Sequence, residues 1–236
     1  VSNLNHGKLV RDVSFEARAG EILGFTGLVG AGRTETMRLL FGADVPETGT
    51  IELDGRQLLI RNPQAAIRHG ICLLTEDRKS QGLVLGQSVR HNFGLPNLNR
   101  FSTAGVVNEP KERSAFGGYV KNLGIKIPHQ DQLAQNLSGG NQQKVVLAKW
   151  LERNAEVIIF DEPTRGIDVR SKGQIYELIE ELAAEGAAIL MISSDLEEIL
   201  RISDRVLVMH EGQFAGELSR DELTEESVMQ LATGAQ

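Results

Sequence analysis

The sequence predicts an α/β fold organised around one phosphate-binding turn. A glycine-rich turn from Gly27 to Thr34 follows the apolar run Ile22 to Phe25 and precedes the helix-like segment Glu35 to Phe41. Regular alternation of apolar strand-like runs with helical patterns returns from Asn136 onward. The 236 residues suffice for one α/β domain with an inserted lobe and do not require two independent domains.

Composition narrows the class of partner. The net charge is −7 and no long basic run occurs, so a nucleic-acid groove or an anionic membrane surface is disfavoured as a binding partner. Cys72 is the only cysteine and lies in the apolar run Ile71 to Leu74, which predicts a buried, unreactive thiol. No apolar stretch approaches the roughly 18 residues that span a bilayer, so we expect any membrane link to go through another chain.

The first third predicts short strands around the glycine-rich turn. Val1 to Arg18 carries alternating apolar positions, and we expect edge strands there, beside the phosphate site. The elements expected next are a strand and hairpin turn, a short helix, a buried strand and an exposed charged loop: Thr50 to Gly55, Pro63 to His69, Ile71 to Leu74 and Thr75 to Gly86.

The middle of the chain lacks the regular alternation of strand-like and helical patterns that the rest of the sequence shows. Irregular Asn, Gly and Pro positions surround a helical stretch from Glu109 to Leu123, which predicts an inserted, mostly helical lobe. We therefore expect one domain in three segments, residues 1–87, 88–135 and 136–236. The elements expected in the last segment are a helix that Ser138 caps, then strand, helix, strand, helix, hairpin and helix: Ser138 to Arg153, Val157 to Phe160, Val169 to Ala184, Ala187 to Ile192, Leu196 to Arg201, Arg205 to Glu217 and Asp221 to Ala232.

The glycine-rich turn has the spacing of the nucleotide P-loop. Small residues let successive backbone N–H groups face one concavity, and the helix that begins there adds its positive dipole end. Arg33 stands where the motif has lysine, and a planar guanidinium is a poor substitute for a compact ammonium at a crowded phosphate. The nucleotide-binding candidates are Gly27, Gly30, Ala31, Gly32, Arg33, Thr34, Glu35 and Glu76.

Phosphate chemistry also needs a metal site and a base. The Thr34 hydroxyl can bind Mg²⁺, and the Asp161 carboxylate, at the tip of an apolar strand, can hold the metal through its water shell. Glu162 is the candidate general base for an attacking water. An Asp-Glu pair after a strand can also be an ordinary helix cap, but its pairing with a P-loop favours the catalytic interpretation.

The run Leu137-Ser138-Gly139-Gly140-Asn141-Gln142-Gln143-Lys144 decides between the remaining classes. With it, the chain resembles the ATP-binding proteins of ABC transporters, whose signature this is. The resemblance covers essentially the whole chain in the right order, and it implies a RecA-like core, an antiparallel β subdomain, an inserted helical subdomain, and ATP with Mg²⁺.

The resemblance also implies roles for particular residues. Asp168 lies in the D-loop, and Ser194 lies at the switch position, where it is a catalytic candidate beside Glu162. The signature residues would face the γ-phosphate of ATP held by the P-loop of an opposing nucleotide-binding domain; they are Leu137, Ser138, Gly139, Gly140, Asn141 and Gln142.

Several motifs together look like the C-terminal nucleotide-binding half of bacterial importers of ribose, galactose or xylose, which fuse two such domains in one chain. This resemblance implies a second ABC domain in the same chain, transmembrane permease subunits and, indirectly, a sugar-binding protein. It implies a peripheral location on the cytoplasmic face of the cell membrane. A sequence that begins at Val1 without methionine fits a piece of such a longer polypeptide.

Three positions depart from the general ABC pattern. Arg33 replaces the P-loop lysine, Glu76 lies where a glutamine is expected, and Ser194 lies where a histidine is expected. Each change weakens phosphate binding or transition-state stabilisation. The hypothesis is that this half binds or hydrolyses its own nucleotide poorly, while its signature completes the partner's site.

Other functions fit the sequence less well. A regulatory half that binds nucleotide but never hydrolyses it is the alternative within the family. An ABC ATPase of translation or DNA repair is disfavoured because this sequence has no basic linker and no long coiled-coil insertion. A P-loop GTPase is disfavoured because this sequence has no Asn-Lys-x-Asp base-reading motif and does carry the signature.

Overall fold

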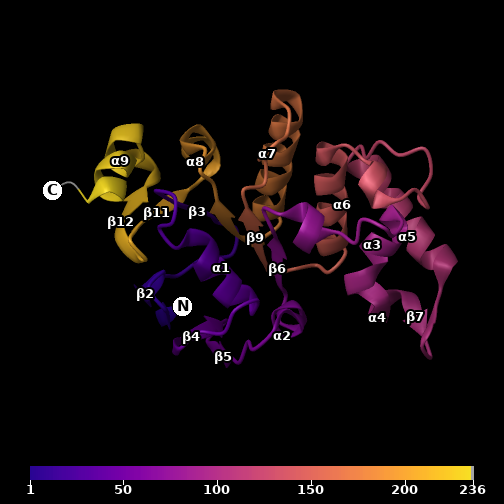
Figure 1. Cartoon of the computed structure of the whole chain (residues 1–236), viewed down its shortest axis with the longest axis horizontal. Helices are drawn as coiled ribbons and strands as arrows, with labels where there is room; N and C mark the ends of the chain where they lie inside the picture. The colour runs from indigo at the N-terminus through magenta and orange to yellow at the C-terminus, as the bar shows by residue number, and fades with distance from the viewer. Residues whose placement is uncertain (235–236) are drawn as a thin grey trace. The chain divides into compact units, whose positions relative to one another are not determined.

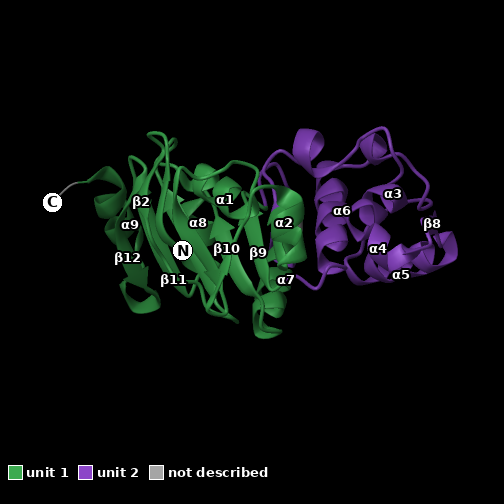
Figure 2. Ribbon diagram, turned by 90° about the horizontal axis from the view of Figure 1, so that it is seen from below, with its two compact units in different colours: residues 1–73, 156–163, 175–236 green, residues 74–155, 164–174 purple. Residues whose placement is uncertain are grey.

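The computed structural model describes residues 1–234 and, for residues 169–171, the backbone only. The chain forms two compact units, which Figure 2 draws in green and purple. Unit 1 comprises residues 1–73, 156–163 and 175–236, and unit 2 comprises residues 74–155 and 164–174. The segment expected as a helical lobe, residues 88–135, lies within unit 2. Every helix among the described residues is too short or too polar to cross a lipid bilayer.

A six-stranded sheet forms the centre of unit 1, in the order β12-β11-β3-β10-β9-β6. Strands β9, β10, β3 and β11 run parallel to one another, and β12 is antiparallel to β11. Every residue of β10 is buried, as expected of a parallel strand with both faces covered. The strands are β3 (Ile22–Gly27), β6 (Ile71–Leu74), β9 (Val157–Asp161), β10 (Ala188–Ile192), β11 (Arg205–His210) and β12 (Gln213–Ser219).

Helices cover this sheet, with α1 on one side of it and α8 on the other (Figure 1). Local signals start two of the helices: Asn62 accepts from the Ala65 N–H before α2, and Thr224 accepts from the Ser227 N–H before α9. The helices that lie wholly or mostly in unit 1 are α1 (Arg33–Phe41), α2 (Pro63–Arg68), α7 (Val169–Ala184), α8 (Leu196–Ile202) and α9 (Glu225–Thr233). The expected strand and helix order is confirmed here, and Cys72 is fully buried as expected.

The start of the chain differs from the expectation. We predicted edge strands over 1–18 beside the phosphate site; β2 is an edge strand of a separate antiparallel sheet with the order β2-β1-β4-β5, whereas β1 is an inner strand of that sheet. A short turn joins β1 to β2, and such a turn allows antiparallel pairing without a crossover. The strands are β1 (Ser2–His6), β2 (Val10–Val13), β4 (Thr48–Leu53) and β5 (Arg56–Leu58). The β4–β5 hairpin was predicted and is confirmed.

Unit 2 is mostly helical and has its own aromatic core. The Phe93 ring lies 5.1 Å from that of Phe116, 5.5 Å from that of Tyr119 and 5.6 Å from that of Phe101, measured between ring centroids. Its elements are α3 (Val89–Gly94), α4 (Leu98–Phe101), β7 (Ser102–Thr103), β8 (Val106–Val107), α5 (Glu109–Asn122) and α6 (Gly139–Leu151).

The segment from Thr75 to Gly86 is more ordered than the exposed loop that its charges predict. A π-helical turn spans Arg78–Gly82, and the Asp77 carboxylate accepts the Lys79 and Ser80 N–H groups at its start. Leu83 is buried at 6 % exposure. A local side-chain cap therefore orders a segment whose composition alone suggested a solvated loop.

Candidate functional site

The loops that follow three parallel strands of unit 1 carry most of the predicted site. Phe25 of β3 pairs with Ile192 at the end of β10, and Ile192 pairs with Asp161 at the end of β9. The carboxyl ends of these strands therefore meet at one edge of the sheet, where ligands of open α/β sheets bind. The structure thus brings the P-loop, the Asp161-Glu162 pair and the Ser193-Ser194 pair together.

The P-loop backbone depends on close approach at Gly32. This residue has φ +97° and immediately precedes α1, and a Cβ there would lie 1.9 Å from the Leu9 carbonyl oxygen. No other residue type fits this position without movement of the backbone. Glu35 lies in the first turn of the helix. The turn therefore presents a helix amino terminus at the sheet edge, as a phosphate cradle requires.

Arg33 does not extend into this loop as a phosphate ligand would. Its side chain is buried at 9 % exposure, and the guanidinium Nη1 donates to the Ser193 carbonyl oxygen over 2.9 Å. The arginine thereby links the start of α1 to the end of β10. This backbone contact uses the length of arginine.

Thr34 and Asp161 are placed as the metal site was predicted. The Thr34 hydroxyl donates to Asp161 Oδ1 over 3.2 Å, and Asp161 is 3 % exposed. A hydroxyl and one carboxylate suit Mg²⁺, which takes few protein ligands and completes its shell with water and phosphate oxygens. Among the described residues, no cluster of three or more His, Cys, Asp or Glu residues is suited to hold a metal ion. The donor set therefore fits a Mg²⁺–nucleotide complex.

Glu162 is held by the residue at the switch position. Ser194 Oγ donates to Glu162 Oε2 over 3.0 Å, and Glu162 adopts φ +51°, a left-handed backbone rarely taken by non-glycine residues. Burial raises the pKa of the Glu162 carboxyl above its usual 4.5, and the Ser194 hydrogen bonds and the nearby Arg33 charge oppose this rise. A carboxylate with a raised pKa is suited to accept a proton.

Glu76 lies in unit 2, where its carboxylate forms an ion pair with Arg165. Arg165 follows the Asp161-Glu162 pair in sequence and contributes to unit 2 through residues 164–174. The glutamate that stands here in place of glutamine therefore has a charged partner within unit 2. That partner could not be read from the sequence, because 89 positions separate the two residues.

The signature residues border a cavity of about 660 Å³ in unit 2. Sequence reasoning assigned roles to Ser138 through Asn141 and to Asp168, and it gave no role to Lys126, Lys144 or Gln174. The full lining is Gly124, Lys126, Ser138, Gly139, Gly140, Asn141, Lys144, Gly166, Ile167, Asp168 and Gln174. Lys144 ends the signature run itself, so its position in the motif could have singled it out.

Two lysines, Lys126 and Lys144, and one aspartate, Asp168, are the charged residues that line this cavity. Lys144 Nζ donates to Gln174 Oε1 over 3.0 Å. Burial lowers the Lys144 pKa, the Lys126 charge lowers it further, and the Asp168 carboxylate opposes both effects. Two cations beside a helix amino terminus favour an anionic occupant.

Gly139 lies against the guanidinium of a neighbouring arginine. A Cβ on Gly139 would lie 2.7 Å from Arg78 Nη2, so the glycine lets this guanidinium pass against the start of α6. Arg78 also donates to the Arg165 carbonyl oxygen over 3.2 Å. Arg78 is therefore a further cation beside the signature that sequence reasoning did not assign to this motif.

Ser138 occupies the N-cap position of α6 as predicted, but its side chain makes no capping hydrogen bond. Its hydroxyl accepts from Asn141 Nδ2 over 2.9 Å instead. The prediction of the position was correct and the prediction of a capping side chain was wrong, because the hydroxyl faces the Asn141 amide and no backbone N–H of α6. Gln142 is buried at 3 % exposure, and its Nε2 donates to the Ala134 carbonyl oxygen over 3.0 Å.

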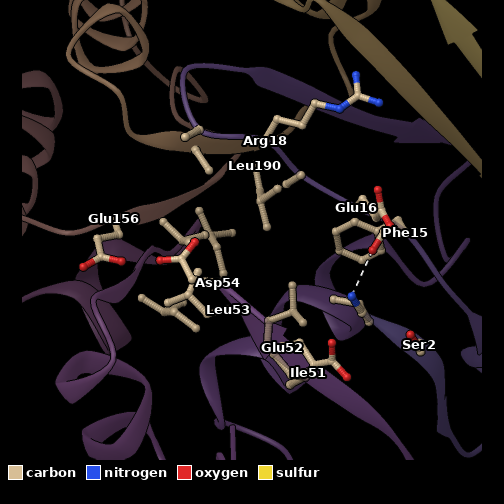
Figure 3. Close-up of a pocket in the computed structure, with 18 of the residues that line it drawn as sticks. Ser2, Phe15, Glu16, Arg18, Ile51, Glu52, Leu53, Asp54, Glu156 and Leu190 are labelled. Carbon is tan, nitrogen blue, oxygen red and sulfur yellow. Dashed lines mark hydrogen bonds between the residues drawn. The ribbon is translucent and has the colours of Figure 1, made fainter. Parts of the chain in front are cut away.

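A second cavity of about 680 Å³ lies in unit 1 (Figure 3). Ala188 and Val157, the first residues of β10 and β9, contribute to its wall, as do Phe15, Leu53 and Leu190. It therefore lies at the amino ends of the parallel strands, and none of the predicted site residues lines it. Its position argues against a role in nucleotide binding.

Comparison with known proteins identifies the family. The model of the ABC transporter family matches residues 10–165. The chain belongs to the ABC transporter family. Two ribose import ATP-binding proteins are similar to it: that of Geobacillus kaustophilus is 51% identical over 99% of this chain and 47% of the relative, and that of Lactococcus lactis is 52% identical over 96% and 46%. The chain spans just under half the length of these relatives.

Solved structures of the ABC family share its fold. An ATP-binding cassette in a dimeric, post-hydrolysis state with ADP and phosphate superposes with a TM-score of 0.79 at 18% identity, covering 93% of this chain and 97% of that one. An ADP-bound cassette of an ABC transporter gives 0.80 at 23% identity, covering 99% and 97%. The predicted P-loop NTPase fold of the ABC type, with an antiparallel subdomain, is confirmed.

Proposed function

We propose that this ABC domain binds ATP with Mg²⁺ and energises import of a monosaccharide through a separate permease. The observation that carries the proposal is the identity of 51–52% to ribose import ATP-binding proteins over nearly the whole of this chain. The partners are transmembrane permease subunits, a second ABC domain in the same polypeptide and, indirectly, a sugar-binding protein. The protein is then peripheral on the cytoplasmic face of the cell membrane.

The nucleotide is held in this proposal by the P-loop backbone and the amino terminus of α1. Thr34 and Asp161 hold the Mg²⁺, which would neutralise charge on the phosphate oxygens when bound. Glu162 accepts the proton of the attacking water at a carboxylate oxygen, and its raised pKa supports this role. Gly27, Gly30 and Ala31 complete the proposed nucleotide contacts within unit 1.

We further propose that this domain's own site is the weaker of two. The guanidinium of Arg33 is bound to the Ser193 carbonyl, so binding a phosphate with it would break a buried hydrogen bond. Ser194 lacks the ring that a histidine would offer to a γ-phosphate, and its hydroxyl is bound to Glu162. The signature around Ser138, with Asp168 beside it, then completes the partner domain's ATP site.

Steady-state ATP hydrolysis by the full-length protein assembled with its permease tests this division. Ser138→Arg blocks the partner's site in the proposal and lowers turnover at least tenfold, whereas Ser114→Arg, on the exposed face of α5, leaves it unchanged. The double variant Arg33→Lys, Ser194→His raises turnover by restoring a second site. Unchanged turnover in both Ser138→Arg and the double variant contradicts the division of labour.

The alternative is a regulatory half that never hydrolyses ATP, which the substitutions at Arg33 and Ser194 favour. Single-turnover hydrolysis, trapped at each site separately, distinguishes the two functions. Slow cleavage at this site that Glu162→Gln abolishes supports a weak ATPase site. If neither the wild type nor Glu162→Gln cleaves the nucleotide bound at this site, the regulatory function is supported.

A further inference from the structure

The side-chain amide of Asn141 bridges two parts of the signature region. Its Oδ1 accepts the backbone N–H of Lys126 over 2.8 Å, and its Nδ2 donates to Ser138 Oγ over 2.9 Å. A backbone N–H can only donate, so the atom facing Lys126 must be the oxygen, and the amide orientation follows. The atom facing Ser138 is therefore the NH₂ group.

This orientation restricts the Ser138 hydroxyl. An NH₂ group has no free acceptor site, so Ser138 Oγ must accept from Asn141 and cannot donate to it. The hydroxyl also makes no capping bond within α6. Its hydrogen thus remains available to an acceptor in the cavity that Ser138 lines together with Gly139, Gly140 and Lys144.

We propose that Asn141 is a positioning residue that fixes the Ser138 hydroxyl as a hydrogen-bond donor toward the phosphate of the partner domain's ATP. The inference rests on the proposed function, in which the signature completes the partner's site. Asn141 need not contact the nucleotide; it acts through the hydroxyl it holds. It also ties the start of α6 to the backbone after α5, which keeps the hydroxyl in place.

The residue type fits this role better than its nearest isosteres. Aspartate at position 141 could still accept from Lys126, but its second oxygen would face Ser138 and draw the hydroxyl hydrogen away from the cavity. Leucine has nearly the same shape and can neither donate nor accept. Comparison of the two separates loss of the bridge from reversal of its polarity.

The test is a double-mutant cycle on ATP hydrolysis by the full-length protein assembled with its permease. We expect Ser138→Ala and Asn141→Leu each to lower kcat by about tenfold, the usual effect of losing one hydrogen bond to a charged group. Because Asn141 acts through Ser138, Asn141→Leu should cause no further loss in the Ser138→Ala background. Asn141→Asp should lower kcat more than Asn141→Leu while Ser138 is present.

Some results overturn the inference alone, and one overturns the proposed function together with it. If Ser138→Ala lowers kcat but Asn141→Leu does not, or if the two losses multiply in the double variant, Asn141 does not act through Ser138. If neither Ser138→Ala nor Ser138→Arg changes turnover, the proposed function of the signature is wrong and the inference is wrong with it. Thermal melting of each variant accompanies the kinetics, and a kcat loss that follows Tm across the variants also overturns the positioning role.

Discussion

At the scale of single residues, Arg33 is the clearest departure from an ordinary nucleotide site. Arginine differs from lysine at this position in the partner that its side chain reaches as well as in its shape. The guanidinium is long enough to reach the Ser193 carbonyl, and a buried donor with a good acceptor gives up that bond only at a cost. Arg33 is thus part of the link between α1 and β10, which a phosphate must compete for.

Arg33 can be tested by two substitutions. Arg33→Lys should tighten ATP binding by the isolated domain about tenfold, since a compact ammonium can sit at the phosphates. Arg33→Met should change the ATP dissociation constant less than about threefold, because the arginine is engaged elsewhere. Fluorescent-nucleotide titration measures both. A loss of tenfold or more in Arg33→Met would show that the arginine already binds phosphate.

Glu162 offers a prediction on pH and stability. Burial raises its pKa, so the folded state holds the proton more tightly than the unfolded state, and stability falls as the pH rises from about 4.5 through the raised value. Glu162→Gln removes this penalty and keeps an acceptor for Ser194. We expect its Tm to exceed that of the wild type by a few degrees at pH 7, with the difference vanishing toward pH 4. A difference that grows toward pH 4 contradicts the assignment.

At the scale of elements, a buried ion pair sets the packing of α3 against α5. Arg90 is 4 % exposed and Glu112 is 2 % exposed, and their side chains form a short salt bridge between the two helices. Asp131 also accepts from Arg90 Nε, over 3.1 Å. Removal of one partner from such a pair leaves a buried charge and is costly.

The absence of a side chain at Gly94 leaves space for the Glu112 carboxylate of this ion pair. A Cβ at Gly94 would lie 1.8 Å from Glu112 Oε1, whereas a Cβ at Gly118 in α5 meets nothing within 4 Å. Gly94→Ala should therefore destabilise the domain by about 2 kcal/mol or more, although alanine favours helices. Gly118→Ala is the matched control and should stabilise by about 0.5–1 kcal/mol. Urea denaturation of both variants measures the difference, and equal effects would contradict this packing.

At the scale of the whole molecule, the weak binding that we propose for this site would limit how much nucleotide can stabilise the isolated domain. A ligand at 100 times its dissociation constant adds about 2.7 kcal/mol, but one at a concentration equal to that constant adds only about 0.4 kcal/mol. The stability gained from ATP therefore reports the affinity of this domain's own site, without a contribution from a partner.

We expect 1 mM Mg²⁺–ATP to raise the Tm of the isolated domain by about 1–2 °C. Arg33→Lys under the same conditions should gain several degrees. Differential scanning fluorimetry with and without EDTA provides the measurement and the metal-removal control. A rise of 5 °C or more in the wild type would identify a tight site and contradict its assignment as the weaker one.

The sequence by itself determined the order of the elements and the location of most candidate site residues. Glycine spacing, apolar runs and caps act over a few residues, so α1, β9 and α7 could be predicted from local pattern. The family followed from motifs in a fixed order, which the match over residues 10–165 confirms. Membership in a separate antiparallel sheet, by contrast, was not predicted for β1, because the strand pattern is the same in either sheet.

Only the tertiary structure decided which partner each polar side chain takes. Arg33 meets a carbonyl 160 positions away, Glu76 meets Arg165 and Ser194 meets Glu162. The bridge from Lys126 through Asn141 to Ser138 likewise joins a loop to a helix start. Local sequence fixes the backbone period and the position of a side chain on its element. Its hydrogen-bond partner depends on which distant segments pack beside it, and those contacts form only when the chain is folded.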